Sequence, residues 1–183
     1  MDPVQPVPAM APTLIDTPRL RLSELDEGDA AFALELLNTE GFLAHIGDRG
    51  VRSLDDARRY LRENPCASYA EHGFGLWKVT RKSDGVAVGM SGLVRRDALP
   101  RPDLGYAFLP AHCGQGLASE AGAAVLAHAF RVLRLPQVLA IVSPGNEASV
   151  RVLAKLGMRE WGLRDFDGES LRVFTREAAP APE

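Results

Sequence analysis

The chain has 183 residues, of which 46% are hydrophobic and 25% charged, a composition typical of one globular domain with its own core. Its net charge of −3 argues against nucleic acid as the main partner, because nucleic-acid-binding proteins usually carry a basic excess. Cys66 and Cys113 are too few for a disulfide framework and lack metal-ligand spacing, and no apolar run is long enough to span a membrane. These features predict a cytoplasmic protein without a bound metal.

The first half of the chain predicts two helices among short strands. Ser53 has the residue type of a helix N-cap, acidic residues follow it in the first turn, and Pro65 marks the end of that helix. Residues 41–52 contain three glycines and predict a loop. In chain order, we expect a strand at 20–22, a helix at 26–37, that loop, a helix at 53–64, and strands at 74–80 and 86–94 joined as a hairpin.

The second half predicts a strand–helix–strand unit followed by a helix and a hairpin. The expected elements are strands at 103–109 and 137–142 on either side of a helix at 119–133, a helix at 147–156, and strands at 158–163 and 170–175. The unit at 103–142 implies a right-handed crossover between parallel strands. We therefore expect an α/β (α+β) fold, with a mixed, mostly antiparallel, twisted sheet of about seven strands flanked by about four helices. One domain at 13–177 is expected between tails at 1–12 and 178–183.

Gly114 and Gly116 lie between the strand at 103–109 and the helix that follows it. Exposed N–H groups at a helix start attract an anion, the helix dipole adds partial positive charge, and glycine allows the backbone to approach a phosphate closely. The sequence contains neither the P-loop pattern of nucleoside-triphosphate binding nor G-x-G-x-x-G, since Leu117 and Ala118 follow Gly116. If this motif is considered alone, the alternative to an anion-binding loop is a glycine-rich connection that binds no ligand.

Longer motifs surround this loop. Residues 104–110 (LGYAFLP) and 114–121 (GQGLASEA) resemble the acetyl-CoA loop of the GNAT superfamily of N-acetyltransferases. Residues 146–149 (NEAS) and 155–158 (KLGM) match the motif that follows this loop in the superfamily. The opening at 17–22 (TPRLRL) is similar to the RimJ/RimL-like branch, which includes enzymes that acetylate protein N-termini.

This resemblance covers residues 13–175 and implies the direct transfer of an acetyl group from acetyl-CoA to a primary amine. It also implies two parallel strands that splay apart at the cofactor site, with the pantetheine chain beside the first. Ala111 and Cys113 stand where the family often has polar or basic side chains, so main-chain N–H groups should hold the pyrophosphate. The residues that the resemblance assigns to cofactor binding are Phe108, Leu109, Cys113, Gly114, Gln115, Gly116, Leu117, Ala118, Asn146 and Ser149.

Acetyl transfer to an amine needs a polarised thioester carbonyl, a base and stabilisation of the departing thiolate. By the resemblance, Asn146 binds an amide of the cofactor, and Ser149 stands near the sulfur in place of the tyrosine that many members have. The two residues share one face of a helix start, where Asn146 could instead act only as an N-cap. Asp103 is the candidate base, acting through water, and a solvated strand-end residue is its alternative.

The sequence specifies the acceptor amine poorly. His45, Arg49 and Arg52 lie in the loop between the two N-terminal helices, where the arginines would suit an acceptor with a carboxylate or phosphate and a solvated loop is the alternative. We interpret His112 as structural and Glu120 as complementing the helix dipole. A protein N-terminus, an aminoglycoside-like sugar, a polyamine and an amino acid all remain open as acceptors, and so does a homodimer. Two other functions remain open: an inactive acyl-CoA-binding module of GNAT type, and a phosphate-binding domain for a different nucleotide.

Overall fold

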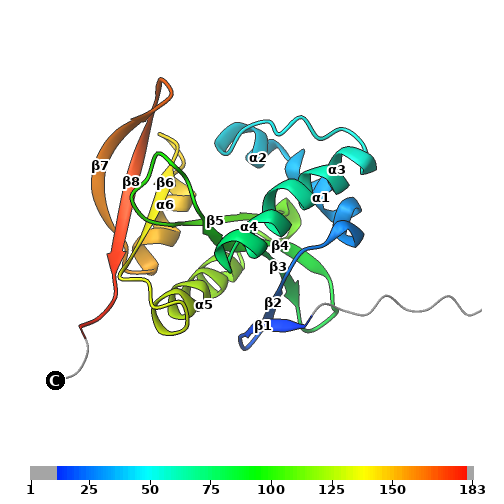
Figure 1. Ribbon diagram of the computed structural model, residues 1–183, viewed down its shortest axis with the longest axis horizontal. Helices are drawn as coiled ribbons and strands as arrows, with labels where there is room; N and C mark the ends of the chain where they lie inside the picture. The colour runs from blue at the N-terminus through cyan, green and yellow to red at the C-terminus, as the bar shows by residue number, and fades with distance from the viewer. Residues whose placement is uncertain (1–11, 181–183) are drawn as a thin grey trace, which may run out of the picture.

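The computed structural model describes residues 12–180, so residues 1–11 and 181–183 of the two expected tails lie outside it. Within this range, eight strands form one sheet in the order β1-β2-β3-β4-β5-β6-β8-β7 (Figure 1). The sheet is mixed and mostly antiparallel, as expected, and β1 is the strand that the sequence pattern did not reveal. The bounds are β1 Thr13–Asp16, β2 Leu20–Ser23, β3 Leu76–Arg81, β4 Ala87–Val94, β5 Asp103–Phe108, β6 Gln137–Val142, β7 Arg159–Phe166 and β8 Glu169–Glu177.

The strands β5 and β6 are parallel and diverge from each other. Asp103 and Leu139 are the residues that stand in register, and the Leu139 N–H donates to the Pro102 carbonyl at 3.0 Å. By contrast, β5 pairs with β4, and β6 with β8, along the whole length of β5 and of β6. The two parallel strands are therefore joined at the start of β5 and open toward its end, which confirms the expected splay.

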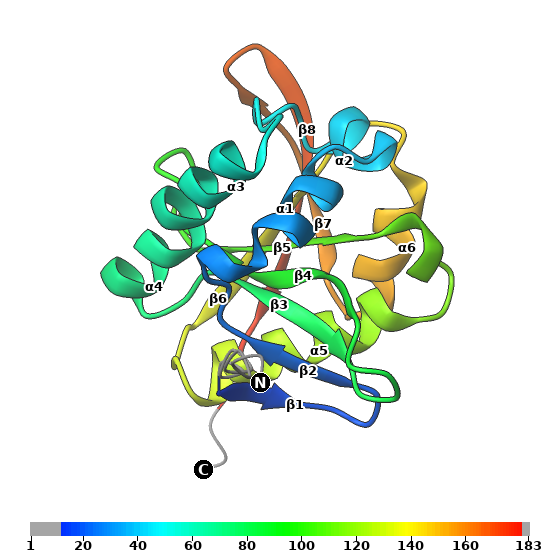
Figure 2. The ribbon, with the colours of Figure 1, turned by 90° about the vertical axis from the view of Figure 1, so that its right-hand side faces the viewer.

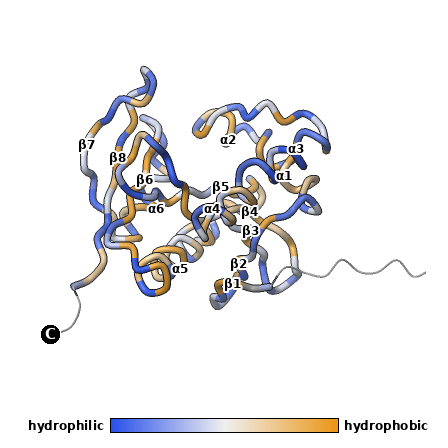
Figure 3. The backbone as a smooth tube through the Cα atoms, in the orientation of Figure 1, coloured by the Kyte–Doolittle hydropathy of each residue, from blue (hydrophilic) through white to orange (hydrophobic). Residues whose placement is uncertain are grey.

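Helices cover both faces of the sheet (Figure 1, Figure 2). One core cluster, which includes Trp77, Val125 and Leu153, lies between the sheet and the helices α5 and α6. A second cluster, which includes Leu36 and Leu61, lies under α1 and α3, and α3 is otherwise largely hydrophilic (Figure 3). In the part of the chain that the structure describes, no helix has the length and hydrophobicity to cross a membrane. The helix bounds are α1 Ala30–Leu37, α2 Glu40–His45, α3 Leu54–Leu61, α4 Ala67–His72, α5 Leu117–Arg131 and α6 Glu147–Lys155.

Two of the expected features between the first helix and β3 are wrong. Residues 40–45 form α2 rather than a loop, because the Thr39 hydroxyl accepts a hydrogen bond from the Phe42 N–H at 3.3 Å and the Phe42 ring is buried. The helix expected to stop before Pro65 continues through one π-helical turn, Arg62–Cys66, into α4. This wider turn accommodates the proline ring, which would clash with the preceding turn of a regular α-helix.

Candidate active site

The glycine loop presents a row of main-chain N–H groups at the start of α5. Gly114 and Gly116 both adopt a φ of 75°, in the left-handed region that favours glycine, and Gly116 is the N-cap of the helix. Within residues 12–180, no protein group accepts a hydrogen bond from the N–H groups between Gly114 and Ser119. Together with the dipole of a 15-residue helix, these N–H groups form a site suited to an anion.

Side chains beside the loop support its shape. The Cys113 thiol is exposed and lies 3.6 Å from the Leu109 carbonyl oxygen. The Nδ1 atom of His112 lies 3.2 Å from Nη1 of Arg81, which also forms an ion pair with Asp84. His112 thereby connects the loop to β3, in keeping with its structural interpretation. Ala111 offers no polar group in its side chain, so the loop's own residues bring main-chain donors rather than a cation.

Alternate residues of β5 turn their main-chain groups toward β6. The Leu109 N–H donates to a carbonyl of β4 at 2.9 Å, whereas the Pro102 carbonyl accepts from Leu139 of β6. Because the direction of main-chain groups alternates along a strand, those of Tyr106 and Phe108 face the gap toward β6. Phe108 is therefore available to pair with a ligand in the gap. The Leu109 N–H is used within the sheet, and its side chain is buried in the core with 7% of the residue exposed, so only that exposed part can contact a ligand.

The start of α6 brings Asn146 and Ser149 together. The side-chain oxygen of Asn146 accepts a hydrogen bond from the Ser149 N–H at 3.3 Å, so Asn146 has the geometry of an N-cap. From β5, the Tyr106 hydroxyl donates to the Ser149 carbonyl at 3.4 Å. Burial raises the pKa of Tyr106, which keeps this hydroxyl protonated. Among the described residues, the Asn146 amide nitrogen and the Ser149 hydroxyl have no hydrogen-bond partner, so both remain available to a ligand.

Asp103 is buried, with 1% of its surface exposed, at the closed end of the gap between β5 and β6. One of its carboxylate oxygens accepts a hydrogen bond from Nε of Arg96 at 2.9 Å. Burial raises the pKa of Asp103 to about 6, and the charge and hydrogen bond of Arg96 oppose this rise. The alternative of a solvated strand-end residue is therefore wrong. A carboxyl group with a pKa this close to neutral suits a general base.

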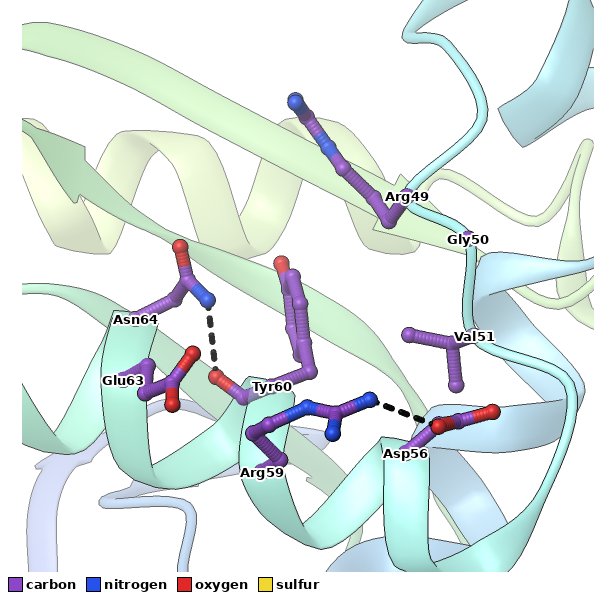
Figure 4. A pocket seen from close by; sticks show the side chains of 8 residues that line it. All are labelled: Arg49, Gly50, Val51, Asp56, Arg59, Tyr60, Glu63 and Asn64. Atoms are coloured by element: carbon purple, nitrogen blue, oxygen red, sulfur yellow. Dashed lines mark hydrogen bonds and ion pairs between the residues drawn. The ribbon is translucent and has the colours of Figure 1, made fainter.

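A hollow lies on the α3 side of the sheet, between α3 with its π-helical extension and the loop that precedes α3 (Figure 4). Arg59 is turned to Asp56, at 2.7 Å, whereas Arg49 and the Tyr60 hydroxyl point to the same side of the hollow (Figure 4). Burial raises the pKa of Tyr60, and the positive charges of Arg49 and Arg96 oppose that rise. Tyr60 therefore lies within electrostatic range of Arg96, the ion-pair partner of Asp103.

The other two candidates for the acceptor side make structural contacts. Arg52 donates to the carboxylate of Asp48 and, at 2.9 Å, to the side-chain oxygen of Asn38. The main-chain carbonyl of His45 accepts a hydrogen bond from the Ser143 hydroxyl at 2.7 Å, which joins the end of α2 to the loop between β6 and α6. Across residues 12–180, the structure contains no group of three or more His, Cys, Asp or Glu side chains placed to hold a metal ion.

Residues 19–159 match the family model described as the acetyltransferase (GNAT) domain. The chain belongs to the GNAT acetyltransferase family. This GNAT acetyltransferase is 30% identical to the uncharacterized protein YkkB of Bacillus subtilis (strain 168) over 151 residues, 81% of this chain and 86% of YkkB. It is 26% identical to a solved acetyltransferase from Agrobacterium tumefaciens str. C58, with a TM-score of 0.77 over 95% of this chain and 99% of that one.

The fold also matches RimL, a ribosomal L7/L12 alpha-N-protein acetyltransferase solved in complex with CoA, with a TM-score of 0.72 over 88% of this chain and 96% of RimL. At 16% identity, this likeness establishes the GNAT fold alone.

Sequence reasoning missed three side chains at the site of this GNAT acetyltransferase. Arg96 stands seven residues before Asp103 in a polar loop, where nothing but the opposite charge signals the pair. Tyr106 belongs to the quoted LGY motif, but the motif gives no sign that its hydroxyl reaches α6. Arg19 belongs to the TPRLRL opening, and its contact with the glycine loop appears only in the fold.

Proposed function

We propose that this GNAT acetyltransferase transfers an acetyl group from acetyl-CoA directly to a primary amine. The observation that carries the proposal is the row of N–H groups from Gly114 to Ser119, for which residues 12–180 supply no acceptor and which follows the open end of β5. A pyrophosphate suits this row because it is anionic and offers several acceptor oxygens to converging main-chain donors.

The proposed cofactor site has two sides. On the first, the loop residues Gly114, Gln115, Gly116, Leu117 and Ala118 bind the pyrophosphate through their main chain, and Cys113 flanks it. The pantetheine chain then lies in the gap, where it pairs with the main chain of Phe108 and packs on the Leu109 side chain. On the second side, the Asn146 amide nitrogen donates to an amide oxygen of the pantetheine, and Ser149 lies near the sulfur.

The proposed chemistry begins with loss of a proton from the acceptor ammonium to Asp103, through water. The amine nitrogen then attacks the thioester carbonyl carbon and releases its second proton to solvent water, the carbon–sulfur bond breaks, and the sulfur leaves with the electron pair. A main-chain N–H near Phe108 polarises the carbonyl. The Ser149 hydroxyl is a weak acid, so it stabilises the thiolate by a hydrogen bond rather than by full proton transfer.

We place the acceptor on the α3 side because Tyr60, which lines the hollow with Arg49, lies within electrostatic range of Arg96, the ion-pair partner of Asp103. The acceptor class is a protein N-terminus or a small-molecule amine. The TPRLRL opening favours membership of the RimJ/RimL-like branch, and with it the N-terminus. The proposal also includes a cytoplasmic enzyme in which residues 13–177 form a single acetyltransferase domain.

An acetyl-CoA consumption assay across a panel of amines tests this function. The panel includes peptides with free N-termini, and the same peptides with blocked N-termini are the matched controls. We expect CoA release with at least one free amine and none with the blocked peptides. Tight CoA binding without turnover on any amine would contradict the proposal and favour an inactive acyl-CoA-binding module.

A further inference from the structure

The side chain of Arg19 lies behind the glycine loop and contacts both the loop and α5. Its Nη1 donates to the Gln115 carbonyl at 2.9 Å, and its Nε pairs with Glu120 at 2.6 Å. The main-chain N–H of Arg19 and the Thr17 hydroxyl also donate to Glu120, at 2.9 and 2.7 Å. We propose that Arg19 is a positioning residue for the anion-binding loop, an inference that rests on the proposed binding of CoA there.

The first effect of Arg19 is to fix the direction of one loop peptide. The C=O and N–H of a trans peptide point in opposite directions, and the described residues contain no cis peptide bond. With the Gln115 carbonyl held by Arg19, the Gly116 N–H points away from Arg19. A Cβ placed on Gly116 would lie 3.5 Å from Nη2 of Arg19, so the guanidinium occupies the back of the loop. An anion therefore approaches from the front.

The second effect of Arg19 is to neutralise Glu120 in the first turn of α5. The side chain of Glu120 is 17% exposed, and burial raises its pKa, but hydrogen bonds from Thr17 and Arg19 lower it below the ordinary value overall. Glu120 is therefore an anion beside the proposed pyrophosphate site. Without Arg19, this carboxylate would repel the pyrophosphate and compete for the positive end of the helix.

The turn that carries Arg19 is itself fixed to the sheet. The Lys82 N–H donates to the Arg19 carbonyl at 2.9 Å, and the Lys82 ammonium pairs with Asp16 at 2.6 Å. Thr17 is 9% exposed. Because these contacts hold both sides of the turn, Arg19 reaches the loop from a rigid base, which is what a positioning residue requires.

CoA binding to Arg19→Ala, measured by calorimetry, tests this inference. We expect the Kd to rise roughly 10-fold, the scale of one lost charge-assisted hydrogen bond, and the KM for acetyl-CoA to rise alike with little change in kcat. The KM for S-acetylpantetheine, which lacks phosphates, should not change. Arg21→Ala is the matched control, because the Arg21 side chain is equally exposed on the same segment and its guanidinium lies 3.7 Å from Asp16.

Unchanged CoA affinity in Arg19→Ala, or an equal loss with S-acetylpantetheine, would overturn the inference. If Arg19→Ala does not fold, the variant Arg19→Lys is tested in its place. The lysine keeps a positive charge opposite Glu120 but lacks the guanidinium that also donates to the Gln115 carbonyl. We expect an intermediate loss of CoA affinity in Arg19→Lys, and wild-type affinity there would also overturn the inference. A wild-type chain that fails to bind CoA is a separate result, which would overturn the proposed function itself.

Discussion

Asp103 illustrates how burial can raise the pKa of a carboxyl group toward neutral. At its ordinary pKa of 3.8, a carboxylate holds a proton too weakly to take one efficiently from an ammonium group. Burial raises the pKa of Asp103 to about 6, while Arg96 limits the rise, so the group is a stronger base and is still ionised at neutral pH. The pair therefore matches what the proposed proton transfer requires.

The pH dependence of turnover tests the role of Asp103. We expect kcat/KM of the wild type to rise through an apparent pKa of about 6, because Asp103 must be deprotonated to act as the base. Asp103→Asn should lose this limb and turn over roughly 100-fold more slowly. Asp97→Asn, which removes an exposed carboxylate beside Arg96, is the control and should keep the wild-type profile. An unaltered profile in Asp103→Asn would mean that another group is the base.

The same pKa shift predicts how stability depends on pH. Since the pKa of Asp103 is higher in the folded chain than in the unfolded chain, the folded chain binds more protons between pH 3.8 and about 6. The extra proton binding stabilises the folded chain at low pH, and this contribution to the free energy of unfolding is lost as the pH rises through about 6. Urea unfolding of wild type and Asp103→Asn should therefore show the wild-type advantage shrinking by roughly 2 kcal/mol between pH 4.5 and 7.5. A difference that stays constant with pH would contradict the raised pKa.

At the scale of elements, Asn146 at the start of α6 combines two roles: it caps the helix, and it is proposed to bind CoA. Substitutions at Asn146 can separate these roles. Asp caps a helix about as well as Asn, so Asn146→Asp should unfold at the wild-type urea concentration, whereas Asn146→Ala should lose about 1 kcal/mol. Asp lacks the amide N–H donors, so both variants should lose roughly 10-fold in kcat/KM for acetyl-CoA. Full activity in Asn146→Asp would limit Asn146 to capping.

The elements that the sequence predicts well are those with strong local signals. Ser53 caps α3 as expected, and β6 spans 137–142 as its compact apolar run predicts. The elements that it misses depend on distant contacts. The helix α2 forms where three glycines suggest a loop because Phe42 packs into the core under α1 and α3, and Pro65 is absorbed by a π-helical turn.

At the scale of the molecule, the proposed active site follows from one break in an otherwise continuous sheet. The strands β5 and β6 belong to the same sheet, yet they stay in register at the Asp103–Leu139 pair and then separate. The glycine loop and α5 follow the open end of β5, and α6 follows β6. The helices α1–α4 lie over the face of the sheet opposite to α5 (Figure 2). The gap thus brings together main-chain donors from β5 and the loop with side-chain groups from the start of α6.

The sequence predicts this arrangement in outline but does not predict its ion pairs. The motifs indicate the loop and the start of α6, because glycine and N-cap residues are local signals. No local signal indicates the ion pairs Arg96–Asp103 and Arg19–Glu120, since each joins groups that only the fold brings together. Spacing along a chain gives no measure of burial, and burial dominates the pKa of Asp103.

CoA titration by calorimetry against the wild type and Gly116→Glu tests the central claim most directly. A side chain at a φ of 75° is strained, and one at Gly116 would begin 3.5 Å from Nη2 of Arg19 and add a negative charge beside the anion site, so we expect tight binding to the wild type and none to Gly116→Glu. Gly168→Glu is the matched control, because it adds the same charge at a similar φ of 86° in the tip of the β7–β8 hairpin, and it should bind CoA normally. Normal CoA affinity in a folded Gly116→Glu chain would contradict the assignment of the glycine loop as the pyrophosphate site.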